Sequence, residues 1–172
     1  MGFLVEESIH GYELYRRFGE TIAGLWRISE SQMYATLKRL EDRGLVDGNP
    51  PEKGAAASRR VLSPSTTGRA LFDTWLFEPS VCNPKVLRLE FLTRLFFARR
   101  LAPGSVTGLF AAQRAFVVRA LERQVVNRGG PSGGFNVFDL ALAFSEGQLR
   151  SALEWLDASV GPALLGKDAT KK

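Results

Sequence analysis

The segment from Leu25 to Val46 constrains the fold of this chain more than any other part of the sequence. Ser29 can accept a hydrogen bond from the backbone N–H of Gln32, which predicts a capped helix start. Gly44 predicts the end of that helix, since glycine readily adopts the left-handed conformation that ends many helices. The residues Leu45 to Asp47 then predict a short strand. The segment is therefore expected to be a helix that leads directly into a sheet.

The expected helix has one apolar face and one polar, cationic face. Met33, Leu37 and Leu40 recur at spacings of three and four residues, which predicts that they are buried. The rest of its surface consists largely of polar, small or basic side chains, namely Gln32, Ala35, Thr36, Lys38, Arg39 and Arg43. Such a face suits contacts with DNA bases and phosphates, whereas the plainer alternative is a solvated helix surface.

The residues on either side complete a small domain. Apolar residues at helical spacing between Gly11 and Ala23 predict a supporting helix, and two helices joined by a tight turn form a helix-turn-helix. Gly2 to Val5 is expected to be the last turn of a first helix. A returning strand at Arg59 to Ser63 predicts a two-stranded wing, after which Ser65 or Thr66 begins another helix. The N-terminal part is therefore expected to be a winged helix-turn-helix.

In this arrangement the N-terminal part of the second helix faces the base edges of the major groove. The predicted base contacts are Ser31, Gln32, Ala35 and Thr36. Gln32 can pair with adenine through two hydrogen bonds, and Ala35 and the Thr36 methyl can contact thymine methyl groups. The predicted phosphate contacts are basic or hydroxyl side chains near this face and on the wing: Arg27, Ser29, Tyr34, Lys38, Arg39, Lys53, Arg59 and Arg60.

The second half of the chain predicts three helical stretches, at residues 85–101, 104–127 and 135–161, separated by Ala102-Pro103 and by the glycine-rich run at 129–134. These stretches carry more apolar surface than one buried face on each helix accounts for. A second copy of the chain is therefore expected to bury the remainder. The predicted dimer interface consists of Leu92, Phe96, Phe138, Leu142, Leu149, Leu153 and Leu156. Val137, Leu140 and Phe144 lie on a neighbouring face of the last helix.

The charge distribution leaves a second function class open. The chain has a net charge of +5, which suits a polyanionic partner, but Met1 to Glu78 holds 10 Lys and Arg against 11 Asp and Glu. The cations of this part lie mainly on the expected recognition helix and wing, so the local potential favours DNA. The alternative is an interaction or assembly scaffold that does not bind DNA.

The sequence offers no support for catalysis or for a bound cofactor. His10 is the only histidine and has no partners at metal-ligand spacing, so a capping or turn role is expected for it. Cys82 is the only cysteine, which excludes an intramolecular disulfide and favours a reducing, cytoplasmic setting. No apolar run has the length of a membrane span. The three tryptophans could line an effector pocket, but core packing is the favoured interpretation.

Several short motifs resemble the PadR family of bacterial transcriptional regulators. They are the runs at residues 10–14, 25–29, 33–41 and 44–46, which read HGYEL, LWRIS, MYATLKRLE and GLV, and the run EFLTRLFFA at 90–98. The resemblance spans most of the chain. It implies a winged helix-turn-helix that binds operator DNA as a homodimer through C-terminal helices, usually as a repressor relieved by a small-molecule effector.

The sequence therefore predicts a mainly α protein with three segments. Residues 1–78 are expected to form a winged helix-turn-helix with a two-stranded wing, residues 79–165 a three-helix dimerisation domain, and residues 166–172 a disordered tail. The expected function is transcription regulation, with double-stranded DNA of pseudo-palindromic sequence as partner and without a membrane, metal or cofactor.

Overall fold

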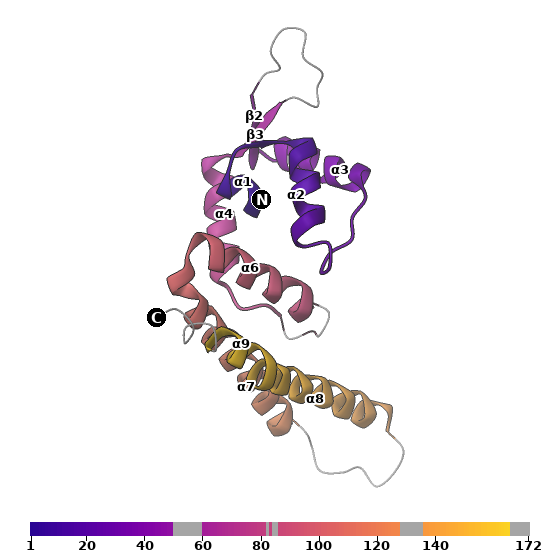
Figure 1. The fold of residues 1–172 in the computed structure, drawn as a ribbon. Helices are drawn as coiled ribbons and strands as arrows, with labels where there is room; N and C mark the ends of the chain where they lie inside the picture. Colours follow the sequence, from indigo (N-terminus) through magenta and orange to yellow (C-terminus); the bar gives the residue numbers. More distant parts are fainter. Residues whose placement is uncertain (50–59, 82, 84–85, 128–135, 166–172) are drawn as a thin grey trace. The chain divides into compact units, whose positions relative to one another are not determined.

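The computed structural model describes residues 1–49, 60–81, 83, 86–127 and 136–165. The chain divides into two compact units, Met1–Glu78 and Pro79–Lys172, and each is described here by itself. The structure is mainly helical with one small antiparallel sheet, which confirms the predicted fold class (Figure 1). Within the described residues, no helix combines the length and the hydropathy needed to cross a membrane.

The N-terminal unit is a winged helix-turn-helix. Its elements are α1 (Gly2–Glu6), β1 (Ile9–His10), α2 (Gly11–Thr21), α3 (Glu30–Asp42), β2 (Val46–Gly48), β3 (Val61–Pro64) and α4 (Thr66–Phe77). The predicted supporting helix is α2 and the predicted recognition helix is α3. The expected first-helix turn is present as α1, and Ser65 caps α4 by accepting a hydrogen bond from Gly68 N–H at 3.0 Å.

The sheet has one strand more than the sequence predicted. Its order is β1-β3-β2, with Ile9 opposite Leu62 and Asp47 opposite Ser63, and both pairs of strands are antiparallel. A strand of two residues between two helices is too short to show an alternating pattern. His10 lies in this strand and at the N-cap position of α2, but its side chain makes no capping hydrogen bond. Of the capping or turn role expected for His10, the structure contradicts only capping by the side chain.

The core of this unit joins all the elements that position α3. It contains Phe3, Leu4, Ile9, Leu14, Ile22, Met33, Leu37, Leu45, Val46, Leu62, Phe72 and Leu76. Met33 and Leu37 are buried as predicted, whereas Leu40 is only half-buried. Burial of each such side chain contributes about 1.5 to 3 kcal/mol to folding, so the apolar face of α3 is the main attachment of the helix.

The start of α4 is tied to the end of α3. Ser65 Oγ donates a hydrogen bond to the carbonyl oxygen of Gly44 at 2.7 Å, and Ser65 N–H donates to the carbonyl oxygen of Leu45 at 3.1 Å. Gly44 has a φ of 65°, the left-handed conformation expected for a glycine that ends a helix. Gly68 packs against Leu45 so closely that a Cβ would come within 1.9 Å of the Leu45 carbonyl oxygen.

The C-terminal unit is helical. It consists of the π-helix η2 (Leu87–Phe91), α6 (Leu92–Leu101), the 3₁₀ turn η3 (Pro103–Ser105), α7 (Val106–Asn127), α8 (Val137–Trp155), the π-helix η4 (Leu156–Val160) and α9 (Gly161–Leu165). The three predicted stretches are present, but the last continues past its predicted end. Gly161 keeps helical dihedral angles and packs near the Phe110 ring, so this glycine serves close packing rather than a helix end.

A buried polar cluster fixes the start of this unit. Ser80 and Gln113 are both fully buried, and they exchange two hydrogen bonds: Ser80 N–H to Gln113 Oε1 at 2.6 Å, and Gln113 Nε2 to the Ser80 carbonyl at 3.0 Å. Arg94, 4% exposed, donates to Ser80 Oγ at 3.1 Å and pairs with Glu90. These partners offset the cost of burying polar groups, which reaches several kcal/mol for an unpaired charge.

A pH-dependent ion pair joins α7 to η4. Arg114 donates two hydrogen bonds to Asp157, at 2.7 and 2.9 Å, and the guanidinium lowers the pKa of the Asp157 carboxyl below its ordinary value of 3.8. A lowered folded-state pKa stabilises the fold above the unfolded pKa, and that stability is lost as pH falls through the folded value. Asp157→Asn should therefore reduce stability at pH 7, and the difference from wild type should shrink as the pH falls below the ordinary pKa of 3.8 and through the lowered folded-state pKa. Urea unfolding at pH 7, 5 and 3 checks this, and a difference that is constant with pH would contradict the role of the charge.

Candidate nucleic-acid interface

The exposed face of α3 begins at a complete capping box. Ser29 Oγ accepts a hydrogen bond from Gln32 N–H at 3.3 Å, and Gln32 Oε1 accepts one from Ser29 N–H at 2.9 Å. Ser31 shares a hydroxyl hydrogen bond with Ser29 at 3.0 Å. The capping box satisfies two backbone groups and fixes the first turn of α3.

The structure brings the predicted base-contacting residues together on this surface. Ser31, Gln32, Ala35 and Thr36 are all exposed on the first two turns of α3. The Thr36 hydroxyl donates to the Gln32 carbonyl at 2.8 Å and accepts from Arg39 Nη2 at 3.1 Å. Since this hydroxyl is engaged within the helix, the methyl group is the part of Thr36 suited to a base contact.

The side chain of Gln32 closes the capping box, and its amide group also suits the base contact that the sequence predicts for it. Its Oε1 already accepts the Ser29 N–H, and the amide Nε2 is the donor that a pairing with adenine requires. A carbonyl oxygen has two lone pairs, so one acceptor can serve both the capping box and a base. The sequence predicted the base contact but not this second task of the side chain.

Tyr34 connects α3 to α2. It is half-buried, and a Cβ at Gly11 would lie 2.9 Å from the Tyr34 ring carbon Cε1, so only glycine leaves room for the ring. Burial, together with the negative charge of Glu30, raises the pKa of the Tyr34 phenol. The phenol therefore keeps its proton at neutral pH and can donate to an acceptor such as a phosphate.

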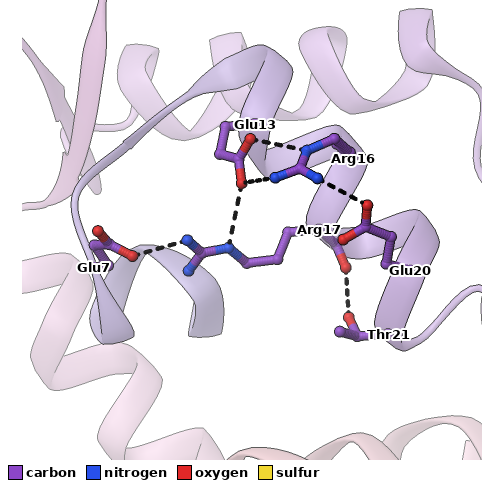
Figure 2. A network of polar contacts seen from close by, with 6 residues as sticks. All are labelled: Glu7, Glu13, Arg16, Arg17, Glu20 and Thr21. Atoms are coloured by element: carbon purple, nitrogen blue, oxygen red, sulfur yellow. Dashed lines mark hydrogen bonds and ion pairs between the residues drawn. The ribbon is translucent and has the colours of Figure 1, made fainter.

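Two arginines of α2 form ion pairs with nearby carboxylates (Figure 2). On α2, Arg16 binds Glu13 at 2.7 Å and Glu20 at 3.0 Å, while Arg17 binds Glu7 at 2.8 Å, next to the end of α1. The Arg16 guanidinium lowers the pKa of the Glu13 carboxyl, and the pKa of Arg16 is raised in return. These cations are therefore neutralised by carboxylates.

The cations on and before α3 are placed differently. Arg27, Lys38 and Arg39 are exposed, and none of them makes an ion pair with any residue that the structure describes. The N-terminal unit is near neutral in total, but in its described part Arg27, Lys38 and Arg39 place positive charge without a carboxylate partner around the polar face of α3. A local positive potential attracts polyanions even when the net charge is small.

Arg60 occupies a different position from the one expected of a phosphate contact. Its guanidinium pairs with Glu41 near the end of α3 at 3.2 Å and donates to the carbonyl oxygens of Gly48 at 3.2 Å and Asn49 at 3.3 Å. Arg60 thus joins the base of the wing to α3. Sequence reasoning missed this pair, because it joins residues far apart in the chain.

Two other predicted phosphate contacts, Lys53 and Arg59, lie outside the described residues, as does the predicted tail at 166–172.

The prediction for the dimer interface needs correction at two positions. Leu149 is 5% exposed and Leu156 is fully buried, so both side chains belong to the core of the C-terminal unit and offer no surface to a partner. In the described part of the chain, no cluster of His, Cys, Asp and Glu could hold a metal ion.

Comparison with known proteins identifies relatives of the N-terminal unit. Residues 1–74 match the model of the transcriptional regulator PadR-like family. The negative transcriptional regulator PadR of Bacillus subtilis is 24% identical over 113 residues, which are 66% of this chain and 62% of that protein. The probable transcriptional regulator Rv1176c of Mycobacterium tuberculosis is 33% identical over 76 residues, 44% of this chain and 40% of that protein. The matched part thus spans less than two thirds of either relative.

Solved structures with a similar fold include Bacillus subtilis PadR in complex with operator DNA, which is 21% identical, covers 91% of this chain and 92% of its own, and has a TM-score of 0.44. The PadR-like transcriptional regulator BC1756 of Bacillus cereus is 20% identical in sequence, and its match covers 96% of this chain and 95% of that chain with a TM-score of 0.39. The family model covers the winged helix-turn-helix except for the end of α4. Residues 1–74, which include the helix Glu30–Asp42, are therefore similar to the transcriptional regulator PadR-like family.

Proposed function

We propose that this chain is a sequence-specific DNA-binding transcriptional regulator that acts as a homodimeric repressor in the cytoplasm. The observation that carries the proposal is the exposed, unpaired cationic and polar face of α3, held by a winged helix-turn-helix. The PadR-like family match and the name of the Bacillus subtilis relative, a negative transcriptional regulator, support it. The proposal assigns no catalytic step to the chain.

Each part of the interface has a role in this proposal. Ser31, Gln32, Ala35 and Thr36 read base edges, while Arg27, Ser29, Tyr34, Lys38 and Arg39 hold phosphates. Lys53 and Arg59 are further phosphate contacts. Arg60 holds the base of the wing to α3 through its ion pair with Glu41, and this role replaces the phosphate contact predicted from the sequence.

The two halves of the chain have separate tasks in the proposal. Residues 1–78 bind DNA and residues 79–165 join two copies, so that two α3 helices lie about 34 Å apart and read successive major grooves of a pseudo-palindrome. A small-molecule effector that binds one dimer conformation better would relieve repression. An assembly scaffold without DNA binding is the competing hypothesis.

A titration of labelled duplex distinguishes the two functions. The DNA upstream of the chain's own gene is titrated with protein and compared with a scrambled duplex of equal length, at two salt concentrations. The regulator should bind the upstream duplex at least about 1,000-fold more tightly than the scrambled one. Equal affinity for both duplexes, or no binding at low salt, would favour the scaffold.

The role of Gln32 can be separated from its part in the capping box. Gln32→Ala should lose about 1 to 3 kcal/mol of discrimination at one base pair of the site, because the amide that pairs with adenine is removed. Ser29→Ala is the comparison variant: it removes the other half of the same capping box together with a proposed phosphate contact, so it should lower affinity for every base variant equally and leave the base preference unchanged. Affinities for single-base variants of the site are the measurement. If both variants lose affinity uniformly over all bases, Gln32 acts only as a cap.

A further inference from the structure

A carboxylate lies on the inner side of the recognition helix. Glu41 follows Met33 and Leu37 at intervals of four residues, so it lies on the side of α3 that packs into the core. Its oxygen Oε1 is buried and makes no hydrogen bond in the part of the chain that the structure describes. A carboxylate in such a place is unfavourable unless a cation lies beside it. None of the predicted base contacts lies on this side of the helix.

The cation beside Glu41 is Arg60, the residue directly before β3. Its Nη2 lies 3.2 Å from Glu41 Oε1, and the two side chains are only 35% and 25% exposed. The same guanidinium donates from Nη2 to the Gly48 carbonyl oxygen at 3.2 Å and from Nε to the Asn49 carbonyl oxygen at 3.3 Å. Arg60 therefore joins the end of β2 and the start of β3 to the last turn of α3.

The pair fills the space that a side chain at position 48 would need. A Cβ at Gly48 would overlap the Arg60 guanidinium and would lie 2.8 Å from Glu41 Oε1. Both groups end long flexible side chains, so they can move away while the backbone stays in place. Gly48 is not among the residues with a positive φ, so alanine brings no backbone strain there. A methyl group at this position should separate the pair without unfolding the unit.

The pair lies at the base of the wing, where its direction is set. β2 ends at Gly48 and β3 begins at Val61, and the predicted phosphate contacts Lys53 and Arg59 lie between these two positions in the sequence. The way in which the chain leaves β2 and enters β3 decides where these two cations can lie relative to α3. A contact that holds both strand ends to α3 therefore affects DNA binding without touching the DNA.

We propose that Glu41 is a positioning residue for DNA binding, which acts through Arg60 to hold the base of the wing against the last turn of α3. The wing and the recognition helix can then contact one duplex together. This inference rests on the DNA binding of the proposed function, and it gives a task to Glu41 and Gly48, neither of which contacts DNA.

The proposal predicts the opposite sign from simple electrostatics. A carboxylate on a DNA-binding helix repels phosphates, so its removal is ordinarily expected to strengthen binding. Glu41→Ala should instead lower the affinity for the duplex upstream of the chain's own gene about 10-fold, because the wing cations lose their place at the phosphates. Fluorescence anisotropy with labelled duplex measures this change.

Asp42→Ala is the matched control. Asp42 is the next residue of α3, is exposed, and makes no ion pair with any residue that the structure describes. Both substitutions remove one negative charge from the same turn of the helix. Asp42→Ala should leave the affinity unchanged or raise it slightly, since only repulsion of the phosphates is lost.

The salt dependence separates positioning from a merely structural role. Glu41→Ala removes no cation, yet the slope of log affinity against log salt should fall by about 0.9 for each phosphate contact that the wing loses. A destabilised protein that binds in the wild-type way keeps the wild-type slope. All titrations are therefore run well below the thermal unfolding transition, which circular dichroism locates for each variant.

Two further variants test the route through Arg60. Gly48→Ala changes no charge, and it should reproduce the loss of affinity and the lower slope of Glu41→Ala, because its methyl group displaces the same guanidinium. In an Arg60→Gln background, Glu41→Ala should cause no further loss of affinity, since the partner through which it acts is already gone.

The remaining outcomes contradict the proposal. Equal effects of Glu41→Ala and Asp42→Ala would show that only charge matters, and a loss of affinity with an unchanged slope would show a structural role alone. Wild-type binding by Gly48→Ala would exclude the route through Arg60. If the wild-type protein binds upstream and scrambled duplexes equally, the proposed function fails and this inference with it. Specific wild-type binding with an ineffective Glu41→Ala overturns this inference alone.

Discussion

Gly68→Ala should destabilise the N-terminal unit by at least about 3 kcal/mol, the upper range for overpacking, because its methyl group has no space. A Cβ at position 68 would lie 1.9 Å from the carbonyl oxygen of Leu45 and 2.8 Å from its carbonyl carbon. Both atoms belong to the backbone, so no side-chain rotation can relieve the overlap. Relief requires that α4 move away from the residues that follow α3, which breaks the Ser65 hydrogen bonds to Gly44 and Leu45.

Gly19→Ala is the matched control for this substitution. Gly19 lies inside α2 and nothing is within 4 Å of its Cβ position, so alanine should stabilise the protein by about 0.5 to 1 kcal/mol through helix propensity. Thermal unfolding followed by circular dichroism compares the two variants. If Gly68→Ala unfolds at the wild-type temperature or above, the close contact between α4 and Leu45 is wrong.

Removing two cations from α3 should weaken DNA binding strongly. Lys38→Ala with Arg39→Ala takes away two predicted phosphate contacts, so the slope of log affinity against log salt should fall by about 1.8. At low salt the affinity should drop roughly 10- to 100-fold for every sequence, because phosphate contacts carry no base information. Fluorescence anisotropy with specific and scrambled duplexes at several salt concentrations measures both quantities.

The control variant removes an equal amount of positive charge from another part of the N-terminal unit. Arg16→Ala with Arg69→Ala deletes two exposed arginines whose charges are paired with carboxylates. Arg16 pairs with Glu13 and Glu20 (Figure 2), and Arg69 pairs with Asp73. The salt slope should then stay within about 0.5 of the wild-type value, since no phosphate contact is lost. If the two double variants change the slope equally, the effect is one of net charge and α3 is not the DNA-binding surface.

The sequence predicted those elements that carry strong local signals. The Ser29 cap of α3, its buried face and the Gly44 end depend on residues within a few positions of each other, so pattern alone identifies them. The strand β1 was missed, because two residues cannot display alternation and the pairing of Ile9 with Leu62 is a long-range contact. The Arg60 pair with Glu41 and the Ser80 cluster with Gln113 were missed for the same reason.

The face of α8 shows a second limit of sequence reasoning. Both of its apolar stripes have helical spacing, and periodicity cannot tell which one packs inside the chain. The structure assigns Leu149 and Leu156 to the core and leaves Val137 and Phe144 exposed. An apolar stripe thus predicts burial, but the partner that buries it follows only from the packing of the other helices.

Selection of bound duplexes from a random library tests the central claim most directly. The full-length protein is incubated with duplexes that carry a randomised 30-base-pair region, and the bound fraction is sequenced after several rounds. Two α3 helices in a dimer predict an inverted repeat with half-sites about 10 base pairs apart from centre to centre, and Gln32→Ala should lose the preference at one position of each half-site. A library that stays random after selection would contradict the assignment of α3 as a DNA-reading helix.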